Sequence, residues 1–113
     1  MKLLKTEESK DYKGDFIEVG IYYLGGRKRD LLMDDYIQTS IKAKSGSKEA
    51  DVNYKPFTLK AKVMEDYVKI KDNKQITIDD LDEDEYERIF NKYFRNKFKD
   101  IFGANSEEEK VKN

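Results

Sequence analysis

A dense run of carboxylates is the part of this sequence whose residue types could most readily do chemistry. Seven of the nine residues from Asp79 to Glu87 are acidic. Closely spaced carboxylates can bind a cation or act as a general acid and base. Asp80, Asp82 and Asp84 match the first ligand positions of a calcium loop, but Glu85 stands where that loop needs glycine. We therefore predict no metal site, and we expect the acidic run to begin a helix, where the helix dipole favours negative charge.

A second stretch, Gly25-Gly26-Arg27-Lys28-Arg29, could bind phosphate through backbone amides at a helix start with three cations close by. A P-loop would need Gly-Lys-Ser/Thr after four intervening residues, whereas Leu31 and Leu32 stand there. A Gly-Gly pair between a strand and a helix is usually only a turn. We keep weak phosphate or RNA contact as an alternative to that turn.

The composition removes several classes of enzyme. The chain has no histidine and no cysteine, which excludes a conventional hydrolase triad, a histidine acid-base site and a zinc site built on these residues. We predict no enzymatic activity, no catalytic residues and no cofactor. The net charge of −1 combines 23 basic with 24 acidic residues, so no basic excess indicates nucleic acid.

The 113 residues predict one domain with a small core, because 42% of them are charged and only 37% are apolar. No apolar run is long enough to span a membrane, and the N-terminus lacks the apolar stretch of a signal peptide. We expect a soluble, cytoplasmic protein, not a secreted one.

The element expected to organise the chain is a long amphipathic helix from Asp82 to Phe102. Asp82 is its expected N-cap and Gly103 its C-cap. Its apolar residues follow helical spacing: Tyr86, Ile89, Phe90, Tyr93, Phe94, Phe98, Ile101 and Phe102. At about 100° per residue the first half of this stripe points in one direction and the second half about a quarter turn away. We expect the first half to seal the domain's own core and the second half to face the N-terminal elements or a partner.

The remaining elements are expected to be short. Residues 1–13 are mostly charged and predict a flexible arm, with a short strand or a partner-binding arm as the alternative. Asp15 to Leu24 has the β-branched and aromatic composition of a strand that Gly20 could interrupt. A helix is expected after Gly26. The polar stretch 42–54 predicts a mobile loop.

A central helix is expected to begin at Pro56, since proline is tolerated in a first turn. The sequence leaves open whether residues 68–78 form a hairpin or a helix end followed by a loop. Residues 104–113 predict a flexible tail. The expected fold is a single, mainly α domain over 14–103 with a short N-terminal strand or hairpin, and α+β is the alternative.

Three stretches follow one another in a recognisable order: Gly14-Asp15-Phe16-Ile17-Glu18-Val19, then Leu24-Gly25-Gly26-Arg27-Lys28-Arg29, then Ile78-Asp79-Asp80-Leu81 before Tyr86-Glu87-Arg88-Ile89. This order resembles the small tail assembly chaperones of long-tailed bacteriophages and related prophages. It spans about Gly14 to Phe102. The resemblance implies a mostly helical fold, no enzymatic activity, and binding to the tape measure protein in the cytoplasm of a bacterial host before the tail tube polymerises. In that family a longer form is often made by ribosomal frameshifting.

Our first hypothesis is accordingly a non-enzymatic tail assembly chaperone. It would bind the tape measure protein, with the tail tube protein as a second candidate partner, and would associate with copies of itself. The residues expected to bind the partner are Tyr93, Phe94, Phe98, Ile101 and Phe102. No membrane is expected among its partners.

Two other hypotheses remain open. One is a small regulatory or inhibitory module that presents an acidic surface to a partner, formed by Asp79, Asp80, Asp82, Glu83, Asp84 and Glu85. The other is a weak nucleic-acid-binding protein that uses Arg27 to Arg29 together with Lys60, Lys62, Lys69 and Lys71. Nucleic acid is the least expected partner, because the charges of the two signs are finely mixed.

Overall fold

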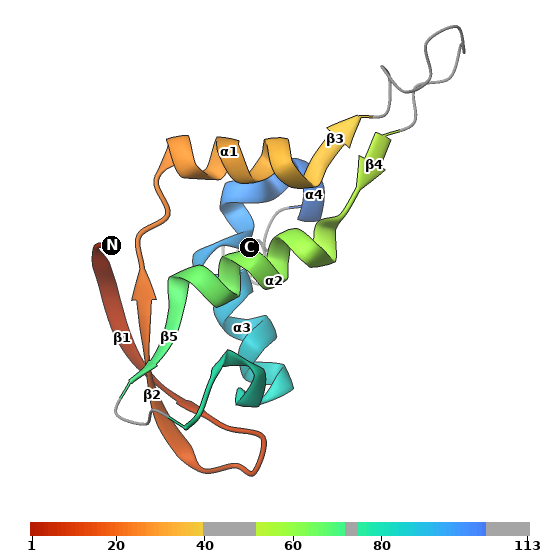
Figure 1. Cartoon of the computed structure of the whole chain (residues 1–113). Coiled ribbons are helices and arrows are strands. Elements are labelled where there is room, and N and C mark those ends of the chain that lie inside the picture. The colour runs from red at the N-terminus through yellow and green to blue at the C-terminus, as the bar shows by residue number, and fades with distance from the viewer. Residues whose placement is uncertain (40–51, 72–74, 104–113) are drawn as a thin grey trace, which may run out of the picture.

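The structure is a computed structural model that describes residues 1–39, 52–71 and 75–103 (Figure 1). Strands β1 (Leu3–Lys10) and β2 (Phe16–Tyr22) form a hairpin and are followed by helix α1 (Gly26–Tyr36). Six further elements follow in order: β3 (Ile37–Thr39), β4 (Val52–Tyr54), α2 (Pro56–Tyr67), β5 (Val68–Lys71), the 3-10 turn η2 (Ile78–Asp80) and α3 (Glu83–Tyr93). A 3-10 turn η3 (Arg95–Phe98) and a short helix α4 (Lys99–Phe102) complete the described part of the chain.

A three-stranded antiparallel sheet in the order β1-β2-β5 forms one side of the molecule (Figure 1). Val19 of β2 pairs with Glu7 of β1 and with Ile70 of β5. β3 and β4 form a separate two-stranded ribbon that extends away from the helices. Because side chains alternate between the two faces of a strand, the buried Val19 and Ile21 point to the helices, and Phe16 and Glu18 point to solvent.

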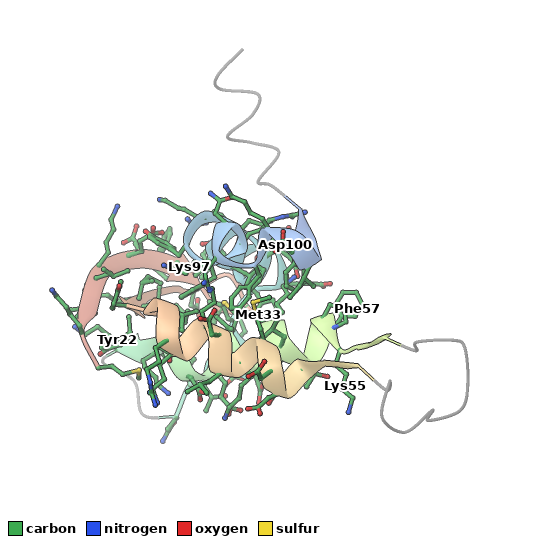
Figure 2. All side chains as sticks on the ribbon, turned by 90° about the horizontal axis from the view of Figure 1, so that it is seen from above. Tyr22, Met33, Lys55, Phe57, Lys97 and Asp100 are labelled. Carbon is green, nitrogen blue, oxygen red and sulfur yellow. The ribbon has the colours of Figure 1, made fainter. Side chains whose placement is uncertain are left out.

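The core lies between this sheet and helices α2 and α3. Its fully buried side chains come from β2, α2, β5, α3 and the turns around them, and they include Val19, Ile21, Leu24, Leu59, Val63, Met64, Val68, Ile89, Phe90, Phe94 and Phe98. Helix α1 contributes no fully buried residue, although Leu32, Met33 and Tyr36 pack against the core from its edge. Figure 2 shows Met33 on the side of α1 that faces the C-terminal turns.

The prediction of a mainly α fold with a long C-terminal amphipathic helix is wrong, because the fold is α+β and that helix ends at Tyr93. The chain turns at Phe94, and the ring of Phe102 then lies 5.1 Å from that of Phe90, edge to face. In an unbroken helix these two residues would be about 18 Å apart along the axis. The break therefore brings Phe102 back onto Phe90.

The C-terminal end of α4 is held to the end of α3 by Arg95, whose guanidinium donates to the carbonyl oxygens of Phe102 and Gly103 and to the side chain of Asn91. Cations suit the carbonyl end of a helix. Gly103 adopts a φ of 79° directly after α4, a conformation that glycine adopts without strain.

The N-terminal third also differs from expectation. Residues 1–13 do not form a flexible arm, since Leu3–Lys10 make up β1. β2 runs through Gly20 without interruption, and the irregularity lies in β1, between Leu3 and Lys5. A Cβ on Gly20 would come within 3.2 Å of the Leu3 side chain. The absence of a side chain at Gly20 therefore lets Leu3 of β1 pack closely against β2.

The central part combines confirmed and corrected expectations. α2 begins at Pro56 as predicted, and Asp82 accepts a hydrogen bond from the Glu85 backbone as an N-cap. Residues 68–71 belong neither to a helix end nor to a hairpin with 75–78, because β5 pairs with β2. Of the loop expected at 42–54, residues 52–54 form β4, and 42–51 lie outside the described residues. The tail 104–113 lies outside them as well.

Candidate protein-binding surface

The contact between β1 and α3 is built around the carboxylate of Glu7. Glu7 points to the helix side of the sheet, where only 10% of its side chain is exposed. Arg88 Nη1 lies 2.9 Å from one carboxylate oxygen, and Lys92 Nζ lies 3.0 Å from the other. The Tyr93 hydroxyl donates a hydrogen bond to the same group. One β1 carboxylate is thereby held by three side chains of α3.

A second polar contact extends this cluster along β1. The hydroxyl of the buried Ser9 donates a hydrogen bond of 2.7 Å to Glu85 Oε1. Glu85 also accepts two hydrogen bonds of 2.9 Å from the guanidinium of Arg88. Two-point contacts between arginine and carboxylate fix orientation as well as distance. The polar cluster of Glu7, Ser9, Glu85, Arg88, Lys92 and Tyr93 therefore fixes α3 across the inner face of β1.

The protonation of this polar cluster follows from its contacts. Burial alone would raise the pKa of Glu7, but hydrogen bonds from Tyr93, Lys92 and Arg88 outweigh it and lower that pKa from 4.5 to about 2. The Arg88 hydrogen bonds lower the pKa of Glu85. Burial, together with the hydrogen bond to Glu7, raises the pKa of the Tyr93 hydroxyl. These shifts stabilise a charged Glu7 and a neutral Tyr93, which suits a structural contact and not proton transfer near neutral pH.

The outward edge of β1 has backbone groups that face away from β2. Asp82 N–H donates to the Lys10 carbonyl at 3.0 Å, and Tyr12 N–H donates to the Asp80 carbonyl at 2.8 Å. The backbone groups of Lys10 thus point outward. Since these groups alternate in an antiparallel strand, those of Thr6 and Glu8 point outward too. No described segment pairs with them, because β1 is the edge strand of the sheet. We call the backbone of Thr6 and Glu8 the open edge.

Exposed apolar side chains lie close to this open edge. Leu3 and Leu4, at the start of β1, are 42% and 50% exposed. Other large apolar side chains are exposed on the β1–β2 hairpin and on the α1–α2 side: Tyr12, Phe16, Tyr23, Leu31 and Phe57. In Figure 2 Phe57 lies at the outer margin, near the start of α2. Exposed apolar groups near a free strand edge are typical of a protein-binding surface.

The five residues expected to bind a partner are mostly used internally. Phe94 and Phe98 are each 1% exposed and belong to the core. Tyr93, Ile101 and Phe102 are partly buried and pack against that core. The break after Tyr93 explains the difference, because it turns the second half of the aromatic stripe inward. These five residues do not form an exposed surface in this structure.

The acidic stretch divides into engaged and exposed residues. Asp80 accepts a hydrogen bond from the Thr77 backbone at 3.0 Å, while Asp82 and Glu85 make the contacts described above. Asp79, Glu83 and Asp84 remain exposed at the start of α3. Half of the predicted acidic surface thus has a structural role. Within residues 1–39, 52–71 and 75–103 no group of acidic residues is arranged to hold a metal ion.

The basic residues considered for nucleic-acid binding have local partners in several cases. Lys60 is largely buried, with its ammonium group against Glu87 and over the rings of Tyr86 and Phe90. Lys62 lies 3.4 Å from Asp66 on the same helix. Arg29 donates to Asp30 at 3.0 Å. Arg27 and Lys28 are exposed at the start of α1, so the structure does not gather these cations into one patch.

Sequence reasoning did not find the polar cluster or the open edge. Residues Lys5 to Ser9 are all polar or charged, so they show no alternation of apolar with polar residues that would predict a strand. In the part of the chain that the structure describes, no helix is long and apolar enough to cross a membrane. Comparison with protein-family models, with curated proteins and with solved structures finds no match.

Proposed function

We propose that this protein is a non-enzymatic assembly chaperone of the kind used by long-tailed phages, which binds the tape measure protein and assists assembly of the tail tube. The observation that carries the proposal is the open edge of β1 beside the exposed Leu3 and Leu4. A protein that holds an elongated partner needs accessible backbone and apolar groups, and this surface offers both.

The state of the polar residues supports a binding role over catalysis. Glu7 and Glu85 accept hydrogen bonds from distant parts of the chain, and Asp80 and Asp82 accept them from backbone N–H groups in their own turns. A catalytic carboxylate must instead reach a substrate in the protonation state that the reaction requires. The strongly lowered pKa of Glu7 removes it as a general acid near neutral pH.

The resemblance in the order of sequence segments from Gly14 to Phe102 is a second support. The helical architecture that this resemblance implies is not among the supports, because the fold is α+β. Binding through Phe94 and Phe98 is not proposed either, since both side chains are buried. The proposed binding surface is therefore at β1.

Co-expression with the tape measure protein tests the proposal. The tape measure protein would be produced alone, with this protein, and with a Leu3→Asn, Leu4→Asn double variant. We expect the wild-type protein to keep the partner soluble and to elute with it on size exclusion, and the double variant to do so less. Equal solubility of the partner with and without the wild-type protein, and no shared elution peak, would contradict the proposal.

A regulatory module with an acidic surface is the second candidate, and one observation favours it. Asp79, Glu83 and Asp84 are exposed near the start of α3. Reversing these three charges to lysine leaves the N-cap at Asp82 in place, so the fold should persist. Loss of partner binding in that triple variant, with binding retained after the Leu3 and Leu4 substitutions, would favour this second candidate.

A further inference from the structure

We propose that the open edge of β1 binds an extended segment of a partner protein by strand addition, antiparallel to β1, with acidic side chains of that segment facing α3. The interaction would add a fourth strand next to β1. It combines backbone hydrogen bonds at Thr6 and Glu8 with charge attraction on the helix side of the sheet. Such strand addition obtains affinity from main-chain groups and specificity from alternate side chains.

The first support is that this edge already pairs with another segment at one end. Leu81 forms an antiparallel bridge with Asp11, supported by the hydrogen bonds from Asp82 to Lys10 and from Tyr12 to Asp80. This segment runs toward the N-terminal end of β1 and leaves the edge at Asp82, where α3 begins. An added antiparallel strand would continue the same line past Glu8 and Thr6.

The second support is the charge on the helix side of the open edge. Lys5 is exposed there, and no described residue forms an ion pair with it. Arg88 and Lys92 keep 36% and 49% of their side chains exposed while they bind Glu7. Every second side chain of an added strand would point to this face. Acidic residues at those positions would meet three accessible cations, two of which also neutralise Glu7 on the same face.

The outer face of β1 sets a different requirement. Glu8 stands opposite Glu18 of β2 on that face, and both carboxylates are exposed. Side chains of the added strand on that side would lie beside Glu8, so an acidic residue there would be repelled. Apolar residues would suit the neighbouring Leu3 and Leu4. The preferred segment therefore alternates acidic with apolar residues.

The inference identifies how the proposed partner would be held, and it depends on the proposed function only for the identity of that partner. Its test can use a peptide in place of the partner. A capped eight-residue peptide of alternating valine and glutamate matches the preferred pattern. A peptide of alternating valine and lysine has the same backbone with the opposite charge.

The variants separate backbone from side chain at one position. Glu8→Pro removes an outward N–H group, and it leaves the hydrogen bonds to β2 intact because those use the neighbouring residues. Glu8→Ala keeps that N–H group and removes the same carboxylate. Binding would be measured on the full-length protein by amide NMR titration at low salt, with circular dichroism as the check on folding.

We expect the valine–glutamate peptide to shift and protect the amides of Thr6 and Glu8 in the wild-type protein. Glu8→Pro should weaken binding about tenfold, because one backbone hydrogen bond is lost, and Glu8→Ala should bind at least as well as wild type. The valine–lysine peptide should bind more weakly.

Three results would overturn the inference. These are no binding of the valine–glutamate peptide, shifts confined to residues away from β1, or equal affinity of Glu8→Pro and wild type. Tighter binding of the valine–lysine peptide would overturn its charge requirement. If Glu8→Pro does not fold, protection of the Thr6 and Glu8 amides in the wild-type protein decides. Failure of the wild-type protein to bind the tape measure protein would instead count against the proposed function.

Discussion

Helices α1 and α3 have the same length of 11 residues but are held in very different ways. α3 begins with an N-cap and three acidic residues in its first turn, buries Ile89 and Phe90, and binds Glu7 of β1. α1 has no acidic residue in its first turn and no fully buried residue. The N-cap, the favourable interaction of the acidic first turn with the helix dipole, and side-chain burial all stabilise α3, whereas α1 is stabilised by partial contact with the core.

This difference separates the part of the molecule that maintains the fold from the surfaces that are open to a partner. The β1–α3 contact is a fixed framework, because its side chains are buried or bound to one another. The surfaces on α1 and along the open edge of β1 lie outside that framework and are accessible to a partner. Substitutions in matched pairs should therefore have unequal effects on stability.

The largest contrast is expected between Phe90→Ala in α3 and Leu31→Ala in α1. Phe90 is 1% exposed and contacts the rings of Phe94 and Phe102, so its removal should lower the free energy of unfolding by about 3–5 kcal/mol. Leu31 is 43% exposed, and its removal should cost about 0.5 kcal/mol or less. Urea unfolding measures both. Similar losses would show that α1 is anchored as firmly as α3.

The next contrast lies within β1, between Glu7 and its neighbour Glu8. Glu7→Gln should lower the free energy of unfolding by about 2 kcal/mol, because Arg88 and Lys92 lose the negative charge between them. Glu8→Gln, on the exposed outer face, should change it by about 0.5 kcal/mol or less. Urea midpoints of the two variants provide the measurement, and equal midpoints would argue against the polar cluster.

Acid titration sharpens the same comparison. The pKa of Glu7 is about 2 in the folded protein, against a usual value of 4.5. A lowered pKa contributes stability that is complete above the unfolded value and is lost as the pH falls toward the folded value. Wild-type stability should therefore decline between pH 4.5 and about 2, and the decline should be shallower in Glu7→Gln. Urea unfolding at several pH values gives the free energy of unfolding of both proteins. If it falls equally steeply with pH in wild type and Glu7→Gln, the role of Glu7 is contradicted.

The smallest of these effects is expected at the helix starts. Asp82→Ala removes the side-chain oxygen that accepts from the Glu85 backbone at 3.2 Å, and it should cost about 1 kcal/mol. Asp30→Ala in α1 removes only an exposed contact with Arg29, which should be worth a few tenths of a kcal/mol, roughly. Thermal unfolding measures the stability of both variants. Equal losses of stability would mean that the Asp82 cap stabilises α3 no more than the exposed Asp30 contact stabilises α1.

Local sequence signals predicted some of these features and could not predict others. The start of α3, the proline at the start of α2 and the strand β2 follow from capping residues and side-chain composition. The break after Tyr93 does not, because Phe94, Phe98 and Phe102 continue the helical spacing. The contacts that hold the turned chain, between Phe102 and Phe90 and between Arg95 and the end of α4, form only in the folded protein.

β1 was missed for a related reason. Its only large aliphatic residues are Leu3 and Leu4, and its inner face carries Glu7 and Ser9 in place of apolar residues. These polar groups are buried because Arg88 and Glu85 reach them from far along the chain. No local pattern contains that information. The open edge was missed with the strand to which it belongs.

Hydrogen–deuterium exchange at β1, followed by NMR, tests the central claim most directly. In the free protein the amides of Glu7 and Ser9, which face β2, should exchange slowly, and those of Thr6 and Glu8 should exchange fast. In the complex with the co-expressed tape measure protein, the Thr6 and Glu8 amides should become slow as well. A complex in which these two amides exchange as fast as in the free protein would contradict binding at the open edge.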